Sequence, residues 1–360
     1  MNLNDLGWNN FFNNQFEQIK DEGQIPARIS MELRNLFHIF CEYGELTAEL
    51  SGRYRHRVKD RSELPCVGDW VVVSARPEEG TATIHNLLER KSSFTRKEAG
   101  LRTEEQVLAA NIDTTFLVSG LDHDFNLRRI ERFITTVWES GASPVIVLNK
   151  TDLVDNLQEY IERVDTVAFG IPVCTVSALN NTGIDQIAGY LKPGETAAFL
   201  GSSGVGKSTI INCLYGSELF KTGAVREDDS RGRHTTSHRE MIIIPERGIL
   251  IDTPGMRAVQ LWGDTETLKS SFQDVEELTL QCKFTDCRHQ TEPGCAIQRA
   301  LADGTLDPKR FESYLKQQRE LISLAIRKNQ KEARREAREF GRKIRQYHQD
   351  IKALRKKGLA

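Results

Sequence analysis

The stretch Gly201-Ser202-Ser203-Gly204-Val205-Gly206-Lys207-Ser208-Thr209 decides how the rest of the chain is interpreted. It follows an apolar run at 197–200 that is typical of a short buried strand, and it precedes a helical pattern that opens at 210–214. A glycine loop in this setting turns backbone N–H groups and a helix N-terminus toward an anion, and Lys207 adds a positive charge. The sequence therefore predicts a nucleoside-triphosphate site, with the hydroxyl of Ser208 on Mg²⁺.

Length and composition indicate a protein of two or three globular domains. The chain has 360 residues, of which 39% are hydrophobic and 28% charged. No apolar run approaches the roughly 18 residues that a membrane span needs. The N-terminal residues lack the basic and apolar regions of a signal peptide. We therefore expect a cytoplasmic protein with no membrane association.

Residues 25–97 have the alternating pattern of short β-strands. Five such strands in this length favour a small closed barrel of the oligonucleotide-binding (OB) kind, with an SH3-like barrel as the alternative. The segment 53–61 combines Arg, Lys and His with Tyr54, so it is expected to be either an RNA contact or a plain exposed loop. Residues 1–24 before the barrel are expected to form an amphipathic segment.

Residues 98–262 alternate between β-branched apolar runs and helical patterns. This alternation predicts a mostly parallel sheet covered by helices on both faces, with ligands at the carboxyl ends of the strands. Each polar motif in this region follows such a strand. The motifs are Asn149-Lys150-Thr151-Asp152 after 144–148, Ser177-Ala178-Leu179 after 172–176, and Asp252-Thr253-Pro254-Gly255 after 249–251.

These motifs select guanine. The carboxylate of Asp152 can accept hydrogen bonds from N1–H and the exocyclic amine of guanine, whereas adenine has no donor at N1. A buried acceptor left unpaired costs about 1–3 kcal/mol, and more when it is charged, which is enough to exclude ATP. Lys150 can lie along the base, Asn149 can tie its loop to the phosphate loop, and the backbone N–H groups of Ser177 and Ala178 can reach guanine O6. The expected ligand is GTP.

The motifs occur in an unusual order. In ordinary small GTPases the phosphate loop comes first, but here the two base-recognition motifs at 149 and 177 precede the loop at 201. The switch segment near 235 and the Asp252 motif follow it. This order indicates a circularly permuted domain, which is tolerable because domain termini usually lie close together on the surface.

The segment after the phosphate-binding domain carries a cluster of metal-ligand residue types. Three of the seven cysteines lie here, in the pattern Cys282-(x4)-Cys287-x-His289-(x5)-Cys295. Three thiolates and one imidazole predict a closed, structural Zn²⁺ site within a helical domain at 263–330. The alternative is three buried thiols beside a surface histidine.

The C-terminal residues are strongly basic. From Lys316 to the end the chain has 15 Lys or Arg and 5 Asp or Glu, although the whole chain has a net charge of −2. Apolar residues recur at helical spacing within 331–360, which predicts a basic amphipathic helix. Such a helix is expected either to contact a polyanion or to be a solvated face.

Taken together, these motifs resemble the RsgA (YjeQ) family of circularly permuted GTPases, over about residues 25–330. The resemblance implies an enzyme that hydrolyses GTP to GDP and phosphate during late assembly of the 30S ribosomal subunit and is stimulated by that subunit. It further implies contact with 16S rRNA through the barrel and the zinc domain, in a protein that is a monomer.

The expected roles within the site follow from phosphoryl-transfer chemistry. Ser208 and a switch threonine, Thr235 or Thr236, should hold Mg²⁺ near Asp252, while Lys207 stabilises charge on the transferred group. Met256 replaces the glutamine that orients water in many GTPases, so intrinsic turnover should be slow. His234 is the candidate substitute, and the alternative is a switch histidine with only a packing role. The expected nucleotide contacts are Asn149, Lys150, Thr151, Asp152, Ser177, Ala178, all of Gly201–Thr209, Asp252 and Gly255.

Other functions are compatible with parts of this pattern. One is a nucleotide-gated RNA-binding switch in which hydrolysis is incidental. Another is a small ATP-dependent kinase, which Asp152 disfavours, and a third is a nucleic-acid-binding protein that depends on zinc alone.

Overall fold

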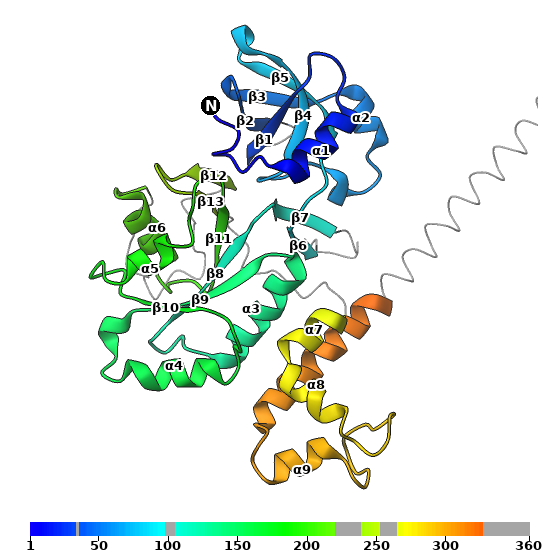
Figure 1. Ribbon diagram of the computed structural model, residues 1–360, viewed down its shortest axis with the longest axis vertical. Coiled ribbons are helices and arrows are strands. Elements are labelled where there is room, and N and C mark those ends of the chain that lie inside the picture. The colour runs from blue at the N-terminus through cyan, green and yellow to red at the C-terminus, as the bar shows by residue number, and fades with distance from the viewer. Residues whose placement is uncertain (34–35, 98–104, 220–238, 253–264, 327–360) are drawn as a thin grey trace, which may run out of the picture.

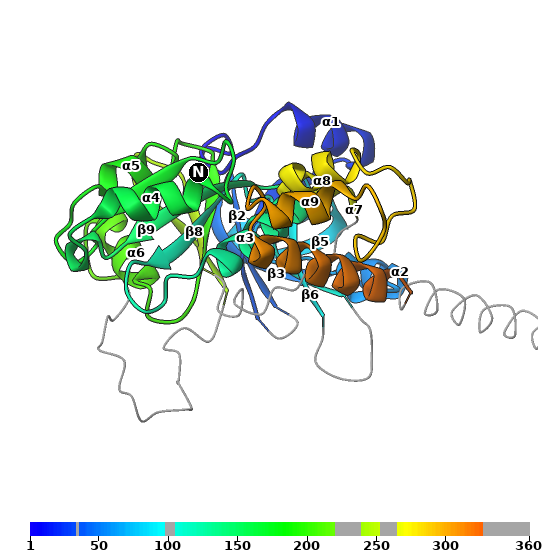
Figure 2. The ribbon, with the colours of Figure 1, turned by 90° about the horizontal axis from the view of Figure 1, so that it is seen from below.

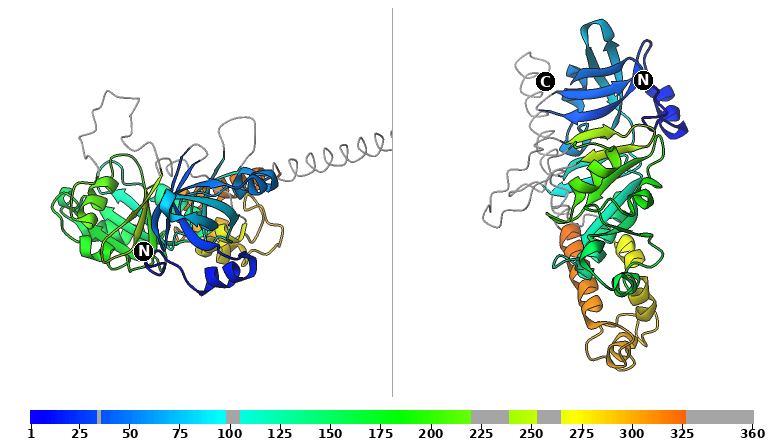
Figure 3. Two further views of the ribbon diagram at one scale, coloured as in Figure 1. Left: turned by 90° about the horizontal axis from the view of Figure 1, so that it is seen from above. Right: turned by 90° about the vertical axis from the view of Figure 1, so that its left-hand side faces the viewer.

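The structure, a computed structural model, describes residues 1–33, 36–97, 105–219, 239–252 and 265–326. Three parts follow one another along the long axis: a β-barrel, an α/β domain in the middle, and a helical module at the far end (Figure 1). The right-hand view of Figure 3 shows the same succession from the side. This is the multidomain arrangement that the sequence predicts. No helix within the described ranges is long and apolar enough to cross a bilayer.

The barrel is built from five strands in the order β1-β2-β3-β5-β4, and β4 returns to pair with β1. β3 and β5 are parallel, and the other pairs are antiparallel. The alternating sequence places one side chain in two inside, so that Ala27 and Ile29 of β1 are fully buried. This closure confirms the predicted OB-like barrel. The strands are β1 (Ile25–Glu32), β2 (Phe37–Cys41), β3 (Gly44–Leu50), β4 (Trp70–Arg76) and β5 (Thr81–Leu87).

The segment between β3 and β4 is not the simple loop expected from sequence. It contains the helix α2 (Gly52–Arg57) and the 3-10 turn η1 (Arg61–Glu63), while η2 (Pro77–Glu79) lies between β4 and β5. The hydroxyl of Ser51 accepts the N–H of Tyr54 at 3.1 Å and so caps α2. The buried Tyr54 donates its hydroxyl to the carbonyl of Glu63 at 2.7 Å. The cations of α2 therefore point outward from a fixed helix.

The N-terminal segment packs against the barrel. Helix α1 (Asn10–Ile19) buries Phe12 and Phe16 in a cluster with Trp70 of β4. The ring of Trp8 lies 4.7 Å from that of Trp70, edge to face. Each buried aromatic side chain stabilises this attachment by about 1.5–3 kcal/mol, so the segment is part of the folded body.

A two-stranded hairpin joins the barrel to the α/β domain. Its strands are β6 (Ser93–Lys97) and β7 (Glu105–Ala110), paired antiparallel. The sequence-based boundary between 97 and 98 lies between these two paired strands, so the hairpin is a connector shared by both domains.

The α/β domain is centred on a six-stranded sheet in the order β10-β9-β8-β11-β13-β12. The first five strands run parallel, and β12 is antiparallel to β13. β12 also pairs with β1 at Met31 and Glu240, which makes the sheet continuous with the barrel. The strands are β8 (Thr114–Gly120), β9 (Ser143–Asn149), β10 (Val173–Val176), β11 (Thr196–Leu200), β12 (Glu240–Ile243) and β13 (Ile249–Asp252).

Helices cover both faces of this sheet, as predicted. On one face α3 (Leu127–Ser140) and α4 (Leu157–Asp165) contribute Ile130, Ile134 and Val164 to the core. On the other face α5 (Ile184–Ala188) and α6 (Lys207–Tyr215) contribute Ile187 and Ile210. A short 3-10 turn, η3 (Thr151–Leu153), follows β9.

The helical module contains α7 (Thr265–Ser271), α8 (Gln273–Thr279), α9 (Ala296–Ala302) and a helix over 308–326. The last of these lies within the helical domain expected at 263–330. A core of its own, including Phe272, Ile297 and Tyr314, holds the module together. The predicted basic helix at 331–360 lies outside the described residues.

Ion pairs join the module to helix α3, beside which it lies in Figures 1 and 2. Arg310 is buried and donates to Glu131 at 2.8 Å and to Asp274 at 2.6 Å. Burial raises the pKa of the Glu131 carboxyl, although the nearby arginines oppose this. Arg132 pairs with Glu320 at 3.0 Å. Removing one partner of a buried ion pair costs about 3–5 kcal/mol. The buried pair between Arg310 and Glu131 therefore resists separation of the module from α3.

Candidate nucleotide site and metal centre

The residues predicted to bind nucleotide follow the carboxyl ends of neighbouring parallel strands. β8 and β9 end level with each other, since Gly120 is opposite Asn149, and Val176 of β10 is also opposite Asn149. β11 leads into the phosphate loop between β8 and β13. Segments separated by many residues in the chain thus meet along one edge of the sheet, where ligands of such folds bind.

The phosphate loop has the backbone geometry that its glycines predict. Gly206 has φ +97, and a Cβ there would lie 2.2 Å from Nδ2 of Asn149, so only glycine fits. Helix α6 begins at Lys207, with Ser208 and Thr209 in its first turn. The Lys207 ammonium donates to the carbonyls of Gly201 at 2.8 Å and Ser202 at 2.6 Å. The arrangement presents a helix N-terminus and a lysine to an incoming phosphate.

Asn149 joins the three loops of the site. Its Nδ2 donates to the carbonyl of Val205 in the phosphate loop at 2.8 Å. Its Oδ1 accepts the backbone N–H of Ala178 at 3.0 Å. The side chain is 2% exposed, so both bonds are shielded from water. The position of the base-recognition loops is therefore fixed relative to the phosphate loop.

The residues predicted to recognise guanine also contact one another. The hydroxyl of Ser177 donates to Oδ1 of Asp152 and accepts the N–H of Asn180 at 3.2 Å. Lys150 has φ +68, and its ammonium lies 2.6 Å from a carboxylate oxygen of Asp122. The Asp152 carboxylate, held by the Ser177 hydroxyl, can accept two donors on one edge of a purine, and guanine presents two such donors.

Sequence reasoning missed a group of charged residues beside these loops: Asp122, Asp124 and Arg129. Burial by itself raises the pKa of Asp122, but its hydrogen bond with Lys150 lowers it, and the net direction is downward. Arg129, on α3, donates to the hydroxyl of Ser202. The available signal was position, because both aspartates come shortly after β8, at the same sheet edge as Asn149.

The described residues include only part of the predicted phosphate-sensing machinery. Asp252 is the last residue of β13, next to the strand that carries the phosphate loop. Gly255, Met256, His234, Thr235 and Thr236 lie outside the described residues.

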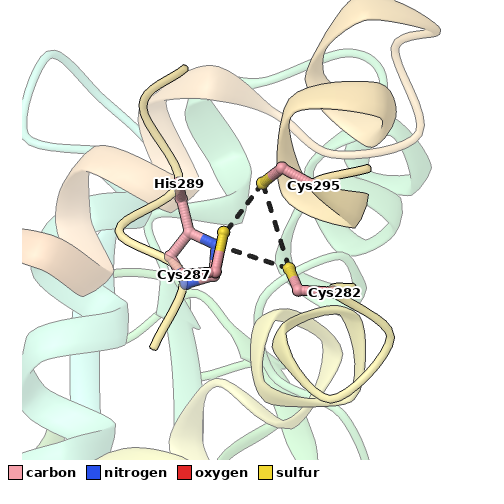
Figure 4. Close-up of side chains that lie close together, drawn as sticks. All are labelled: Cys282, Cys287, His289 and Cys295. Atoms are coloured by element: carbon pink, nitrogen blue, oxygen red, sulfur yellow. Dashed lines mark hydrogen bonds between the residues drawn. The ribbon is translucent and has the colours of Figure 1, made fainter. Parts of the chain in front are cut away.

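The four predicted metal ligands come together in the helical module (Figure 4). Their ligand atoms all lie within 4.8 Å of one another. Sγ of Cys282 is 3.9 Å from Sγ of Cys295 and 3.6 Å from Nδ1 of His289, which is 3.5 Å from Sγ of Cys295. Zn–S bonds of about 2.3 Å and Zn–N bonds of about 2.0 Å give tetrahedral edges of roughly 3.5–3.8 Å. The cluster of Cys282, Cys287, His289 and Cys295 can therefore hold one metal ion.

Surrounding contacts fix these ligands. Cys295 precedes α9, and its sulfur accepts the N–H of Gln298 at 3.4 Å. The Gln298 side chain donates to the carbonyl of His289 at 2.6 Å. His289 has φ +59, a conformation rare for a residue with a side chain, and the bond from Gln298 helps to maintain it.

Two protein-family models match parts of the chain that include the central domain. The sequence model of the RsgA GTPase family matches residues 87–262. A second model, described as 50S ribosome-binding GTPase, matches residues 196–331. Both matches include the phosphate loop.

Curated relatives match almost the whole chain. The small ribosomal subunit biogenesis GTPase RsgA of Opitutus terrae is 46% identical, over 91% of this chain and 92% of the relative. RsgA 1 of Oceanobacillus iheyensis is 44% identical, over 90% and 93%. The RsgA of Syntrophotalea carbinolica is 42% identical, over 97% and 100%.

Solved structures share the fold. YjeQ from Thermotoga maritima superposes with a TM-score of 0.62 at 26% identity, covering 83% of this chain and 99% of YjeQ. YloQ, a circularly permuted GTPase, superposes with a TM-score of 0.59 at 23% identity, covering 84% of this chain and 96% of YloQ. The strand order found here, with the base-recognition strands before the phosphate loop, is in accord with that permutation. With the identities over nearly the full length, these findings show that the chain belongs to the RsgA family of circularly permuted GTPases and is a GTP-hydrolysing enzyme.

Proposed function

We propose that this GTPase acts in late assembly of the 30S ribosomal subunit, where it binds 16S rRNA and hydrolyses GTP in response to the subunit. The names of the relatives that match over most of the chain support the subunit as the partner. The observation that carries the GTP-binding part of the proposal is the joining of the predicted guanine loops to the phosphate loop through Asn149.

GTP would lie along the carboxyl edge of the sheet. Asp152 would accept the two donors of guanine, with the Asp152 carboxylate oriented by Ser177. The backbone N–H groups of Ser177 and Ala178 would face the base oxygen. The loop 201–209 would surround the phosphates, and Lys207 would exchange its present carbonyl partners for phosphate oxygens.

The Mg²⁺ that accompanies GTP would be held by Ser208 and Thr235, and the chain supplies oxygen donors that suit this ion. When bound, Mg²⁺ neutralises charge on the transferred phosphoryl group. Asp252, at the end of β13, is the proposed carboxylate beside the ion. Gly255 would donate its N–H to the terminal phosphate, and His234 would orient the attacking water.

A structural Zn²⁺ is the metal that the module would hold. Three thiolates and an imidazole occupy all four tetrahedral positions, which leaves no position for substrate. The ion would close the loop between Cys282 and Cys295 and stabilise the module that is docked on α3.

The exposed cations of α2 support rRNA as a ligand of the barrel. Arg53, Arg55 and Arg57 come from one fixed helix, with Lys59 just beyond it, and all are exposed. Arg57 also stacks on the ring of Tyr54, with 5.1 Å to the centroid. Exposed cations in a row neutralise phosphates and give salt-dependent binding.

The decisive experiment measures GTP hydrolysis by the purified protein with and without purified 30S subunits. Strong stimulation by 30S, and none by 50S subunits, is the expected result. Equal rates with and without 30S would contradict the proposal. A second measurement compares release of the protein from 30S in GTP with release in a non-hydrolysable analogue. Release that needs hydrolysis supports the proposed enzyme, whereas equal release in both would favour a nucleotide-gated switch.

A further inference from the structure

Helix α3 contacts the phosphate loop through Arg129. One guanidinium nitrogen of Arg129 donates to the hydroxyl of Ser202, the second residue of the loop. The Arg129 guanidinium also donates to the carboxylate of Asp124 at 2.6 Å and to the backbone carbonyl of Asp124 at 2.9 Å. Charge-assisted bonds of this kind are about twice as strong as neutral ones. Arg129 therefore has a fixed direction, toward the loop.

Ser202 connects this contact to the phosphate-binding lysine. The carbonyl of Ser202 accepts Nζ of Lys207 at 2.6 Å, while its hydroxyl accepts Arg129. A displacement of Ser202 thus shifts the backbone of the phosphate loop itself, which would surround the phosphates of a bound nucleotide. Arg129 acts on the site through Ser202, so it is a positioning residue.

The neighbouring residues of the same helical turns contact the helical module. Arg128 donates to Glu131 and to Asp307. Glu131 in turn accepts Arg310, and Arg132 pairs with Glu320. Consecutive helix positions are about 100° apart, so one short stretch of α3 presents Arg129 to the loop and its neighbours to the module.

We infer that α3 couples docking of the helical module to the conformation of the phosphate loop, with Arg129 as the positioning residue at the nucleotide end. The inference rests on the proposed function in one respect, namely that the loop binds GTP and GDP. It adds a route from module to nucleotide that runs through α3 and is separate from the segment that follows Asp252. Coupling of this kind requires that both sites bias one element, and here that element is α3.

The test uses the full-length protein and a fluorescent GDP analogue, with the dissociation rate measured by stopped flow. Arg129→Ala is expected to raise that rate about tenfold, the effect of losing one hydrogen bond to a charged group. Arg129→Lys keeps the charge and one donor and is expected to recover part of the loss. A variant with a lowered melting temperature and an unchanged rate would show a merely structural role and overturn the inference.

Variants at the module end test the coupling. Arg310→Met removes the buried bonds to Glu131 and Asp274, and Glu320→Gln weakens the outer pair. Each is expected to raise the GDP dissociation rate, by about fivefold and about twofold respectively. If Arg310→Met fails to fold, Glu320→Gln, which is partly exposed, still gives the answer. An unchanged rate in the folded variants would refute the coupling.

A double variant decides whether the effect passes through Arg129. Arg129→Ala combined with Glu320→Gln should dissociate GDP no faster than Arg129→Ala alone, whereas multiplied effects would show independent contributions and reject the route. Arg76→Ala and Glu79→Gln, from an exposed pair on the barrel, are the matched controls and should leave the rate unchanged. If the parent protein binds no GDP, the proposed function fails; if the parent binds and Arg129→Ala matches it, only this inference fails.

Discussion

Asn149 and Val205 lie 56 positions apart in the chain, and a hydrogen bond of 2.8 Å joins the side chain of one to the backbone carbonyl of the other. The strand that carries Asn149 precedes the phosphate loop, in contrast to the usual order of GTPase motifs. The contact between them is nevertheless made, because it depends on where β9 and β11 end in one sheet, on either side of β8, and not on the order in which the chain connects these strands.

The substitution Asn149→Ala tests whether the hydrogen bonds of this side chain hold the loops in place. It leaves the Val205 carbonyl and the Ala178 N–H unpaired in a buried place, which costs about 1–3 kcal/mol for each group. Affinity for GTP and for GDP should both fall at least about tenfold, measured by titration with fluorescent nucleotides. Asn156→Ala, at an exposed position after β9, is the control. Parent-like affinity for both nucleotides in Asn149→Ala would show that the loops hold their positions without it.

The substitution Asp152→Asn should change which purine base the site prefers. In Asp152→Asn the side chain gains a donor and loses the negative charge, so it no longer matches N1–H and the amine of guanine. Xanthine has a carbonyl in place of that amine and can accept the new N–H group. GTP affinity should fall about 100-fold and XTP affinity should rise, as measured by competition with a fluorescent nucleotide.

Asp155→Asn makes the same chemical change three residues later, on an exposed side chain, and should alter neither affinity. If Asp152→Asn still prefers GTP to XTP, another residue recognises the base.

Much of this architecture is readable in the sequence, because its signals are local. The phosphate loop, the guanine motifs and the cysteine–histidine spacing each lie within a few residues, and alternation over 25–97 gives the barrel. The ion pairs between α3 and the module are not readable in this way. Arg128 and Asp307 are 179 residues apart, and neither stands in a pattern that names a partner.

Helix α2 shows a second limit. Three of its six residues are arginines, and a basic run of that length usually indicates a solvated loop. The helix depends on the Ser51 cap and on burial of Tyr54 against the barrel, and the second of these is a tertiary contact.

Metal removal should loosen the helical module selectively. Purified protein is expected to contain about one zinc per chain by elemental analysis. Cys282→Ser should lose that zinc, because three ligands seldom retain the metal against chelators, and the module should become sensitive to protease. Cys213→Ser, outside the cluster, should keep its zinc. One zinc retained in Cys282→Ser after dialysis against EDTA would contradict the assigned ligand set.

The proposed role of His234 makes a prediction about rate alone. His234→Ala should lower 30S-stimulated GTP turnover by about 100-fold, within the usual range for a lost proton-handling or water-orienting side chain. GTP affinity should change little, because the residue is assigned to the attacking water and not to the nucleotide. Single-turnover hydrolysis at saturating 30S measures the effect, with His38→Ala on the barrel as the control. Equal stimulated rates would remove His234 from the mechanism.

The barrel surface formed by α2 should contribute phosphate contacts to 30S binding. Each cation that neutralises a phosphate adds about 0.7–0.9 to the slope of log K against log salt. Arg53→Ala with Lys59→Ala should therefore weaken binding most at low salt and reduce the slope by about 1 to 2, measured by co-sedimentation over a salt series. Lys192→Ala with Arg247→Ala removes the same charge from the α/β domain and is the matched control. If both double variants reduce the slope equally, binding responds to net charge and α2 is not the contact; if only the first does, the phosphates lie against α2.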